Sequence, residues 1–341
     1  MAVKAFVSGC AGAALSADET VFFAVEQPLG LILFKRNCDS PEQVRALVAA
    51  FRDAVGRPDA PVLIDQEGGR VRRLRPPRWP DYPPARTFGD IAVADPERAT
   101  RAAWLHGRLI AADLHELGIT MDCAPVLDVI APGASDAIGD RSFGADPSLV
   151  TRLGRAVADG LIAGGVAPIA KHIPGQGRAA VDSHYVLPVV EADLATLART
   201  DFTPFAALAD LPAAMTSHTV FSAIDPMNPA TTSRNLIRDI IRERIGFDGL
   251  LFSDDVSMNA LAGDHRERGK AIFDAGCDIV LHCSGRMDDM RAIADVSPLL
   301  AGKTRERVSR VLATIGTPQP FDRQAAREEY LALTAGAWVG A

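Results

Sequence analysis

Cysteine is scarce in this sequence and never occurs as a closely spaced pair. The 341 residues include five cysteines, Cys10, Cys38, Cys123, Cys277 and Cys283. Their number is odd and no CxxC spacing is present, so the sequence predicts neither a disulfide framework nor a zinc knuckle. We expect free thiols in a reducing compartment.

Long apolar runs and runs of basic residues are also missing. No stretch approaches the roughly 20 apolar residues that a transmembrane helix requires. Residues 7–10 (VSGC) are similar to a lipoprotein cleavage box, but the apolar stretch before the cysteine is far shorter than the roughly 7–15 residues of a signal core. The formal net charge is −7, without clustered Lys or Arg. The sequence therefore predicts a cytoplasmic protein that acts on a small molecule and binds neither nucleic acid nor membrane.

Short runs rich in Val, Ile and Leu recur along the chain, and most are separated by an amphipathic stretch long enough for a helix. One such stretch begins with a capping box at Ser16 and Glu19, and another has Pro41 in its first turn. Further helices are expected over 193–210 and 231–247. This alternation is typical of a parallel sheet. The expected strands are residues 5–9, 29–34, 60–65, 120–126, 166–171, 213–218, 249–254 and 277–283.

Eight strand-then-helix units predict an α/β fold, a single (β/α)8 TIM-type barrel with its active site at the C-terminal ends of the strands. With 48% hydrophobic and 23% charged residues, the chain can bury the core of such a domain. We expect one catalytic domain over residues 1–341, in which 318–341 form a C-terminal packing tail. An open doubly wound sheet is the alternative, but residues 9–15 (GCAGAAL) match its glycine-rich phosphate turn only weakly.

Polar residues end the predicted strands or follow them closely. In a barrel these strand ends share one rim, so the side chains would gather around one mouth. Any one of them alone is more often a cap or an ion-pair partner, but together they suit a ligand with many hydroxyl groups, such as a sugar. The residues are Lys35, Arg36, Asn37, Asp65, Asp128, Arg141, Lys171, His172, His218, Asp254, Asp255 and His282.

Two segments offer the groups that hydrolysis of a glycosidic bond requires, a nucleophile or base and an acid at the leaving oxygen. Asp254 ends an apolar strand and is placed as a carboxylate nucleophile, whereas its neighbour Asp255 is a candidate helix cap. The Pro- and Gly-containing loop 171–184 (KHIPGQGRAAVDSH) carries Asp182 and His184. Their i, i+2 spacing puts both side chains on one side of an extended segment, where the carboxylate can orient the imidazole as a general acid.

Several longer motifs resemble a known family. They are GLILFKRN (30–37), IDQEGGRVRRL (64–74), APVLDV (124–129), GDRSFG (139–144), KHIPGQG (171–177), DSH (182–184), MTSHTVF (215–221), FSDDVSM (252–258) and AGCDIVLHC (275–283). In this order they resemble the bacterial β-N-acetylglucosaminidases of glycoside hydrolase family 3, of the single-domain NagZ type. The resemblance covers most of the chain from 30 to 283.

The resemblance implies a barrel enzyme that needs no metal or other cofactor. It would remove terminal N-acetylglucosamine with retention through a covalent glycosyl-enzyme, with Asp254 as nucleophile, His184 as acid/base and Asp182 as its partner. The usual substrates are cytosolic cell-wall fragments, in which N-acetylglucosamine is joined to 1,6-anhydro-N-acetylmuramic acid with or without a peptide. A monomer is favoured. The residues that would hold the sugar hydroxyls are Asp65, Arg73, Arg141, Lys171 and His172.

The sequence departs from the family in the loop motif. The usual KHFPGHG reads KHIPGQG here, with Ile173 and Gln176 at the changed positions. If the replaced histidine mainly shapes the loop, glutamine can keep a hydrogen bond, but if it titrates, the pH profile or rate will differ. We favour the role in shaping the loop.

Other functions remain open at this stage. Lys171 at a strand end also suits a Schiff-base aldolase, whereas a zinc hydrolase lacks the expected HxH pair. A sugar-binding barrel without activity would have lost Asp254 or His184, and both are present. A different sugar preference is an alternative. Phosphorolysis is another, because a histidine acid/base repels phosphate less than a carboxylate does.

The other histidines have weaker signals. His218 and His282 lie at strand ends, where ligand contacts and satisfied packing positions are equally expected. His106 and His115 fall in a helical stretch, and His265 falls in a polar connector, so we expect solvated or structural roles for these three.

Overall fold

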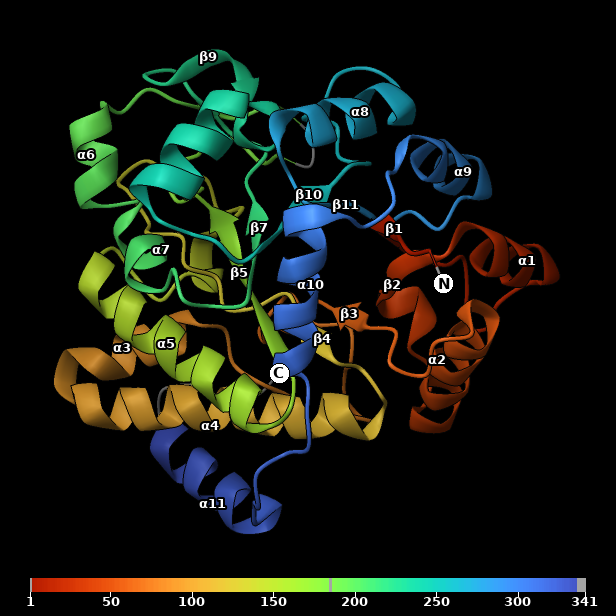
Figure 1. The fold of residues 1–341 in the computed structure, drawn as a ribbon. Coiled ribbons are helices and arrows are strands. Elements are labelled where there is room, and N and C mark those ends of the chain that lie inside the picture. The colour runs from red at the N-terminus through yellow and green to blue at the C-terminus, as the bar shows by residue number, and fades with distance from the viewer. Residues whose placement is uncertain (1, 184–185, 336–341) are drawn as a thin grey trace.

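The computed structural model describes residues 2–183 and 186–335. Eight parallel strands close into a barrel in the order β1-β11-β10-β7-β5-β4-β3-β2, and helices surround it (Figure 1). Each strand lies within or overlaps a segment predicted as a strand, so the predicted (β/α)8 barrel is confirmed. The barrel strands are β1 Lys4–Ser8, β2 Pro28–Leu33, β3 Val62–Ile64, β4 Met121–Asp122, β5 Ala167–Ile173, β7 Ala213–Thr216, β10 Leu250–Asp255 and β11 Ile279–His282.

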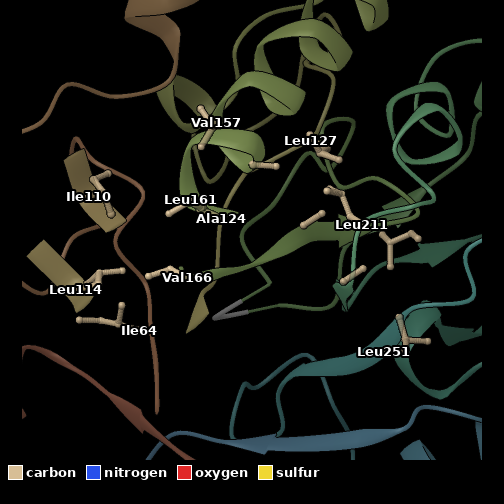
Figure 2. Close-up of a cluster of buried hydrophobic side chains, with 14 of the residues drawn as sticks. Ile64, Ile110, Leu114, Ala124, Leu127, Val157, Leu161, Val166, Leu211 and Leu251 are labelled. Carbon is tan, nitrogen blue, oxygen red and sulfur yellow. The ribbon is translucent and has the colours of Figure 1, made fainter. Parts of the chain in front are cut away.

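Alternation along the strands divides the apolar side chains between two cores. Leu250 and Phe252 of β10 belong to the cluster inside the barrel, whereas Leu251 between them belongs to the cluster between barrel and helices. Figure 2 shows this outer layer, where Ile110 and Leu114 of the helix α4 (Pro96–Glu116) lie near Ile64. Each large apolar side chain buried in this way stabilises the fold by roughly 1.5–3 kcal/mol.

The helices largely follow the sequence prediction. Most of the helices begin at a capping residue or have proline in the first turn, as α1 does at Ser16 and α2 at Pro41. The elements are α1 Ala17–Glu26, α2 Pro41–Val55, α3 Arg86–Ala94, α4 Pro96–Glu116, α5 Pro147–Ala163, α6 Leu194–Arg199, α7 Thr203–Ala207, η4 Leu236–Arg244, α8 His265–Ala275, α9 Met287–Val296, α10 Gly302–Thr314 and α11 Arg323–Thr334, with short 3₁₀ turns η1 Lys35–Asn37, η2 Gly139–Arg141 and η3 Ala230–Thr232.

Three helical regions differ from the expectation. The helix expected over 193–210 is broken into α6 and α7, because Pro204 lacks an N–H donor and fits only in a first turn. The helix expected over 231–247 contains the π-helical segment η4. The helix α3 was not predicted, since Ala85 before it offers no side-chain cap and Gly89 interrupts its pattern.

A small second sheet was also not predicted. It has the order β6-β8-β9, formed by Val189–Val190, Val220–Phe221 and Asp225–Pro229. In this sheet Val189, which follows the loop 174–188, pairs with Val220, which follows β7. The small sheet therefore anchors the end of the loop that carries Asp182.

The helix α11 lies within residues 318–341 and packs against α4 (Figure 1). Arg101 of α4 forms two hydrogen bonds of 2.7 Å to Glu329. Beneath this pair, His106 Nδ1 lies 3.0 Å from the Tyr330 hydroxyl and His106 Nε2 lies 2.9 Å from the Glu67 carbonyl. His106 is therefore structural, as expected, and burial lowers its pKa to about 4.

The described part of the chain contains no helix that combines the length and the apolar character needed to cross a membrane.

Candidate active site

A pocket with a volume of about 200 Å³ opens at the C-terminal ends of the barrel strands. It brings together the predicted catalytic and sugar-binding residues that the structure describes: Asp65, Arg73, Arg141, Lys171, His172, Asp182 and Asp254. Of the other polar residues expected at the rim, Asp255 lines the pocket as well, whereas six do not, and these are Lys35, Arg36, Asn37, Asp128, His218 and His282. The predicted acid/base His184 lies outside the described residues. The barrel thus brings Asp65 and Asp254, which are 189 positions apart in the sequence, to the same mouth.

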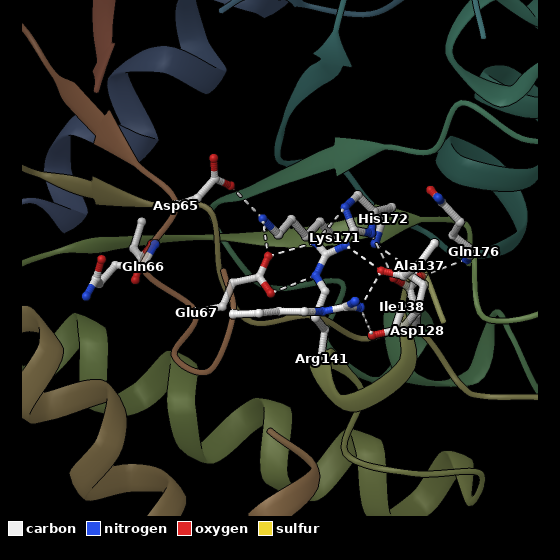
Figure 3. Close-up of polar contacts among 12 residues, drawn as sticks. Asp65, Gln66, Glu67, Asp128, Ala137, Ile138, Arg141, Lys171, His172 and Gln176 are labelled. Atoms are coloured by element: carbon white, nitrogen blue, oxygen red, sulfur yellow. Dashed lines mark hydrogen bonds and ion pairs between the residues drawn. The ribbon is translucent and has the colours of Figure 1, made fainter. Parts of the chain in front are cut away.

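A chain of ion pairs crosses one wall of the pocket (Figure 3). Lys171 Nζ lies 2.7 Å from Asp65 Oδ1 and 2.6 Å from Glu67 Oε1. At one end Arg73 Nη2 pairs with Asp65 at 2.8 Å, and at the other Arg141 Nη2 pairs with Glu67 at 2.8 Å. Three cations share two carboxylates, so the wall carries one net positive charge toward the pocket.

This wall fixes the charge of its members. Burial opposes ionisation of Glu67, but Arg141 and Lys171 lower its pKa to about 2. Burial likewise disfavours the charged form of Lys171, but Asp65 and Glu67 raise its pKa well above the usual range. A Schiff-base lysine must supply a neutral amine, so the arrangement disfavours the aldolase alternative.

Glu67 is a site residue that the sequence reasoning missed. It stands two positions after Asp65, and this i, i+2 spacing was the available signal. The backbone turns directly after it, where Gly68 has φ +96° and a Cβ at that position would lie 2.3 Å from the Pro83 carbonyl oxygen. The turn directs the Glu67 carboxylate back toward Lys171.

His172 is oriented by a buried carboxylate. Its Nδ1 lies 2.7 Å from Asp128 Oδ2, while Asp128 Oδ1 accepts a hydrogen bond of 2.7 Å from the backbone N–H of Gln176. The carboxylate partner favours the proton on Nδ1, which leaves Nε2 as an acceptor 3.5 Å from Arg141 Nη2. His172 thus lines the pocket with its ring held by Asp128, and its role as a ligand contact stays a prediction.

Asp254 and Asp255 end β10 with different environments. Burial raises the pKa of Asp254, but the nearby His218 and His172 outweigh this and leave it below the usual value. Asp255 Oδ1 instead accepts hydrogen bonds from the backbone N–H groups of Ser257 and Cys283, at 2.9 and 3.2 Å. Burial raises the pKa of Asp255. Asp254 is therefore the carboxylate held ionised in the pocket, and Asp255 holds the turn behind it.

Gln176 connects the Asp182 loop to the barrel. Its side-chain Nε2 donates to Ser183 Oγ at 3.0 Å, and its Oε1 accepts from Ser217 Oγ at 3.2 Å. Ser217 follows β7, so the amide spans the gap between the loop and the strand end. An amide makes both bonds without titrating. This geometry fits the role in shaping the loop that we favoured for position 176.

The two strand-end histidines are fully buried. His218 Nδ1 lies 2.7 Å from Thr231 Oγ1 and its Nε2 lies 3.0 Å from the Asp255 carbonyl oxygen. His282 Nε2 lies 2.8 Å from Ser284 Oγ. As far as residues 2–183 and 186–335 define the pocket, neither histidine lines it.

Known proteins are similar to this chain in sequence and fold. Residues 14–314 match the family model described as glycosyl hydrolase family 3 N terminal domain. The β-hexosaminidase of Methylococcus capsulatus is 40% identical over 319 residues, 92% of either chain. That of Bordetella parapertussis is 40% identical over 280 residues, 80% of this chain and 78% of the relative. NagZ from Neisseria gonorrhoeae in complex with N-trifluoroacetyl-D-glucosamine aligns with a TM-score of 0.89 and 32% identity, covering 98% of this chain and 99% of the other. The chain therefore belongs to glycosyl hydrolase family 3 and is a glycoside hydrolase.

Proposed function

We propose that the protein is a retaining exo-β-N-acetylglucosaminidase that removes terminal N-acetylglucosamine. The observation that carries this proposal is the pocket at the barrel mouth, where the ionised Asp254 faces cationic and hydrogen-bonding groups. Its volume of about 200 Å³ is below the roughly 300–1,000 Å³ of pockets for drug-sized ligands, which suits a single sugar ring. Support for the acetamido sugar comes from relatives named β-hexosaminidases and from a neighbour crystallised with an N-acylated glucosamine.

The wall of ion pairs would hold the hydroxyl groups of the sugar. Asp65 offers carboxylate lone pairs, and Arg73, Arg141 and Lys171 offer N–H donors, with His172 Nε2 beside them. Because these groups already pair with one another, they need little rearrangement when the sugar binds. The positive charge of the wall would favour the anionic form of Asp254 before reaction.

The reaction would take place in two displacements. In the first, an Asp254 carboxylate oxygen forms a bond to the anomeric carbon while the bond to the leaving oxygen breaks and His184 protonates that oxygen. In the second, His184 takes a proton from water, whose oxygen displaces Asp254. Asp182 would orient His184 and stabilise its charged form. Two inversions at one carbon leave the product with the configuration of the substrate.

The natural substrate would be a cell-wall fragment carrying N-acetylglucosamine on 1,6-anhydro-N-acetylmuramic acid, with or without a peptide. This part of the proposal rests on the resemblance of the sequence motifs, as does a role in cytoplasmic peptidoglycan recycling. Release of N-acetylglucosamine from the purified disaccharide and from its peptide-bearing form, followed by chromatography, measures both the aglycone and the peptide tolerance.

A substrate comparison tests the proposed activity. Turnover of a chromogenic β-N-acetylglucosaminide is measured against the matching β-glucoside, with EDTA present and in phosphate as well as in a phosphate-free buffer. We expect a strong preference for the acetamido sugar and free N-acetylglucosamine in both buffers. A preference for the glucoside would overturn the sugar assignment, and N-acetylglucosamine 1-phosphate as the product would show a phosphorylase instead.

A further inference from the structure

A second cluster of potential ligands lies outside the pocket, on the helix side of β11. His282 ends β11, His265 begins α8 and Asp289 lies in the first turn of α9. Figure 1 shows these two helices side by side near the end of that strand. One ligand atom from each of the three side chains lies within 4.8 Å of the other two. Side chains from three elements thus converge on one point.

The distances are close to those of a tetrahedral metal site. Zinc bonds of about 2.0–2.1 Å place neighbouring ligand atoms about 3.3 Å apart. His265 Nδ1 lies 3.5 Å from Asp289 Oδ1, which nearly meets this spacing. Ser284 lies between the remaining pair, 2.8 Å from His282 Nε2 and 3.0 Å from Asp289 Oδ2. Small side-chain rotations would bring all three ligands around one ion.

The cluster is partly shielded from water. His282 is fully buried, and a neutral imidazole is a common metal ligand. The side chains of His265 and Asp289 are 23% and 17% exposed, so an ion can reach them from solvent.

Two arginines near the cluster, Arg36 and Arg286, would repel a bound metal ion. Each of them has another partner or can turn away. Arg36 acts on His282 electrostatically, but its guanidinium donates to the carbonyl oxygens of Cys10 and Cys283. Arg286 lies 3.4 Å from Asp289, but its side chain is 76% exposed and can turn into solvent. Neither guanidinium therefore blocks the carboxylate.

We propose that His265, His282 and Asp289 bind a divalent ion of the zinc type, with Ser284 or water as the fourth ligand. Two imidazoles and one carboxylate suit Zn²⁺ better than Mg²⁺ or Ca²⁺, which prefer oxygen ligands alone. The ion would join β11, α8 and α9. Leu281 and Cys283, on either side of His282, line the catalytic pocket, so the ion would stabilise one wall of that pocket without contacting substrate.

Zinc binding to the protein tests this site. The protein is first stripped with a chelator, and Zn²⁺ is then titrated by calorimetry into wild type, His265→Ala and Asp289→Ala. Because the catalytic pocket also holds carboxylates and an imidazole, Asp254→Ala is included to detect zinc there. His115→Ala is the matched control, since His115 is exposed on α4. Circular dichroism verifies that each variant is folded.

We expect wild type to bind one equivalent that is lost in His265→Ala and Asp289→Ala and kept in Asp254→Ala and His115→Ala. Ser284→Ala should weaken binding about 10-fold, because the hydroxyl orients two of the ligands. Saturating Zn²⁺ should raise the Tm of wild type and leave that of His265→Ala unchanged. The site is overturned if folded wild type binds no zinc, if both ligand variants bind as wild type does, or if only Asp254→Ala loses the equivalent.

Discussion

The two sides of the catalytic pocket are built differently. On one side, Asp65, Lys171 and Asp254 are fixed at the barrel rim, at or next to strand ends, and Lys171 is also held by carboxylates at 2.6 and 2.7 Å. On the other, Asp182 lies on a loop that Gln176 connects to Ser183 and Ser217 by two neutral hydrogen bonds. Ion pairs hold Asp65 and Lys171 of the strand side directly. On the loop side the Gln176 side chain makes neutral contacts beside Asp182, and the ion pair of Arg178 with Asp201 at 2.7 Å holds the loop outside the pocket lining.

This difference separates binding from proton transfer. The strand side would hold the sugar and the nucleophile in a geometry that exists before substrate arrives. The loop side would bring the acid to the leaving oxygen, so small changes there should alter catalysis more than affinity. Substitutions on each side should therefore have different kinetic signatures.

The largest effect is expected for Asp254→Asn. The substitution removes the nucleophile while keeping its size, so kcat should fall roughly 10⁴-fold or more with little change in KM. Steady-state kinetics with a chromogenic β-N-acetylglucosaminide measure both quantities. Activity within tenfold of wild type would show that another group attacks the sugar.

The next effect is expected for Glu67→Gln on the strand side. The pKa of Glu67 is lowered from 4.5 to about 2 in the folded protein, so its ionised form stabilises the fold. The shift corresponds to a loss on the order of 3 kcal/mol in the free energy of unfolding at neutral pH. Urea unfolding at pH 7 measures it.

The contribution of Glu67 to the free energy of unfolding should depend on pH. Because the folded pKa is depressed, the stabilisation is fully present above about pH 4.5 and is lost as the pH falls toward 2. Wild type should lose this contribution over that window and Glu67→Gln should not. Glu329→Gln is the matched control on the surface, where its pairing with Arg101 contributes at most about 1 kcal/mol. Equal losses in the two variants would contradict the account of the wall.

A smaller effect is expected for Gln176→Ala on the loop side. Loss of the two hydrogen bonds should lower kcat about tenfold, equivalent to about 1.4 kcal/mol, and leave KM nearly unchanged. Gln176→His should recover part of the rate and add an ionisation near pH 6–7, roughly the usual histidine range, to the pH profile. A rise in KM without a fall in kcat would place Gln176 with the sugar-binding groups instead.

The same contrast explains what the sequence could predict. Apolar runs of strand length marked all eight barrel strands, and the polar residues at their ends identified Asp65, Lys171 and Asp254 as members of the site. The small sheet was not predicted because β6 and β8 have two residues each, too few to show periodicity, and β9 reads DPMNP, in which two prolines argue against a strand. Pro204 did carry a signal for the break between α6 and α7, and it was outweighed by the surrounding helical pattern.

Side chains brought together from separate elements were harder to predict. Glu67 follows the end of β3, beside the turn at Gly68, and pairs with Lys171 of β5. The cluster of His265, His282 and Asp289 has no spacing motif, since its members meet through the packing of α8 and α9 beside β11. Such contacts depend on tertiary packing, which local patterns do not encode.

Covalent attachment of the sugar to Asp254 is the step on which the proposed mechanism depends. A fluorinated N-acetylglucosaminyl fluoride, which slows breakdown of the intermediate more than its formation, should trap this species for mass spectrometry. We predict that the intact protein gains the mass of one fluorinated N-acetylglucosaminyl group and that the label maps to Asp254 after proteolysis. A label on another residue, or turnover of the reagent at the same rate as the natural sugar without any trapped adduct, would contradict the mechanism.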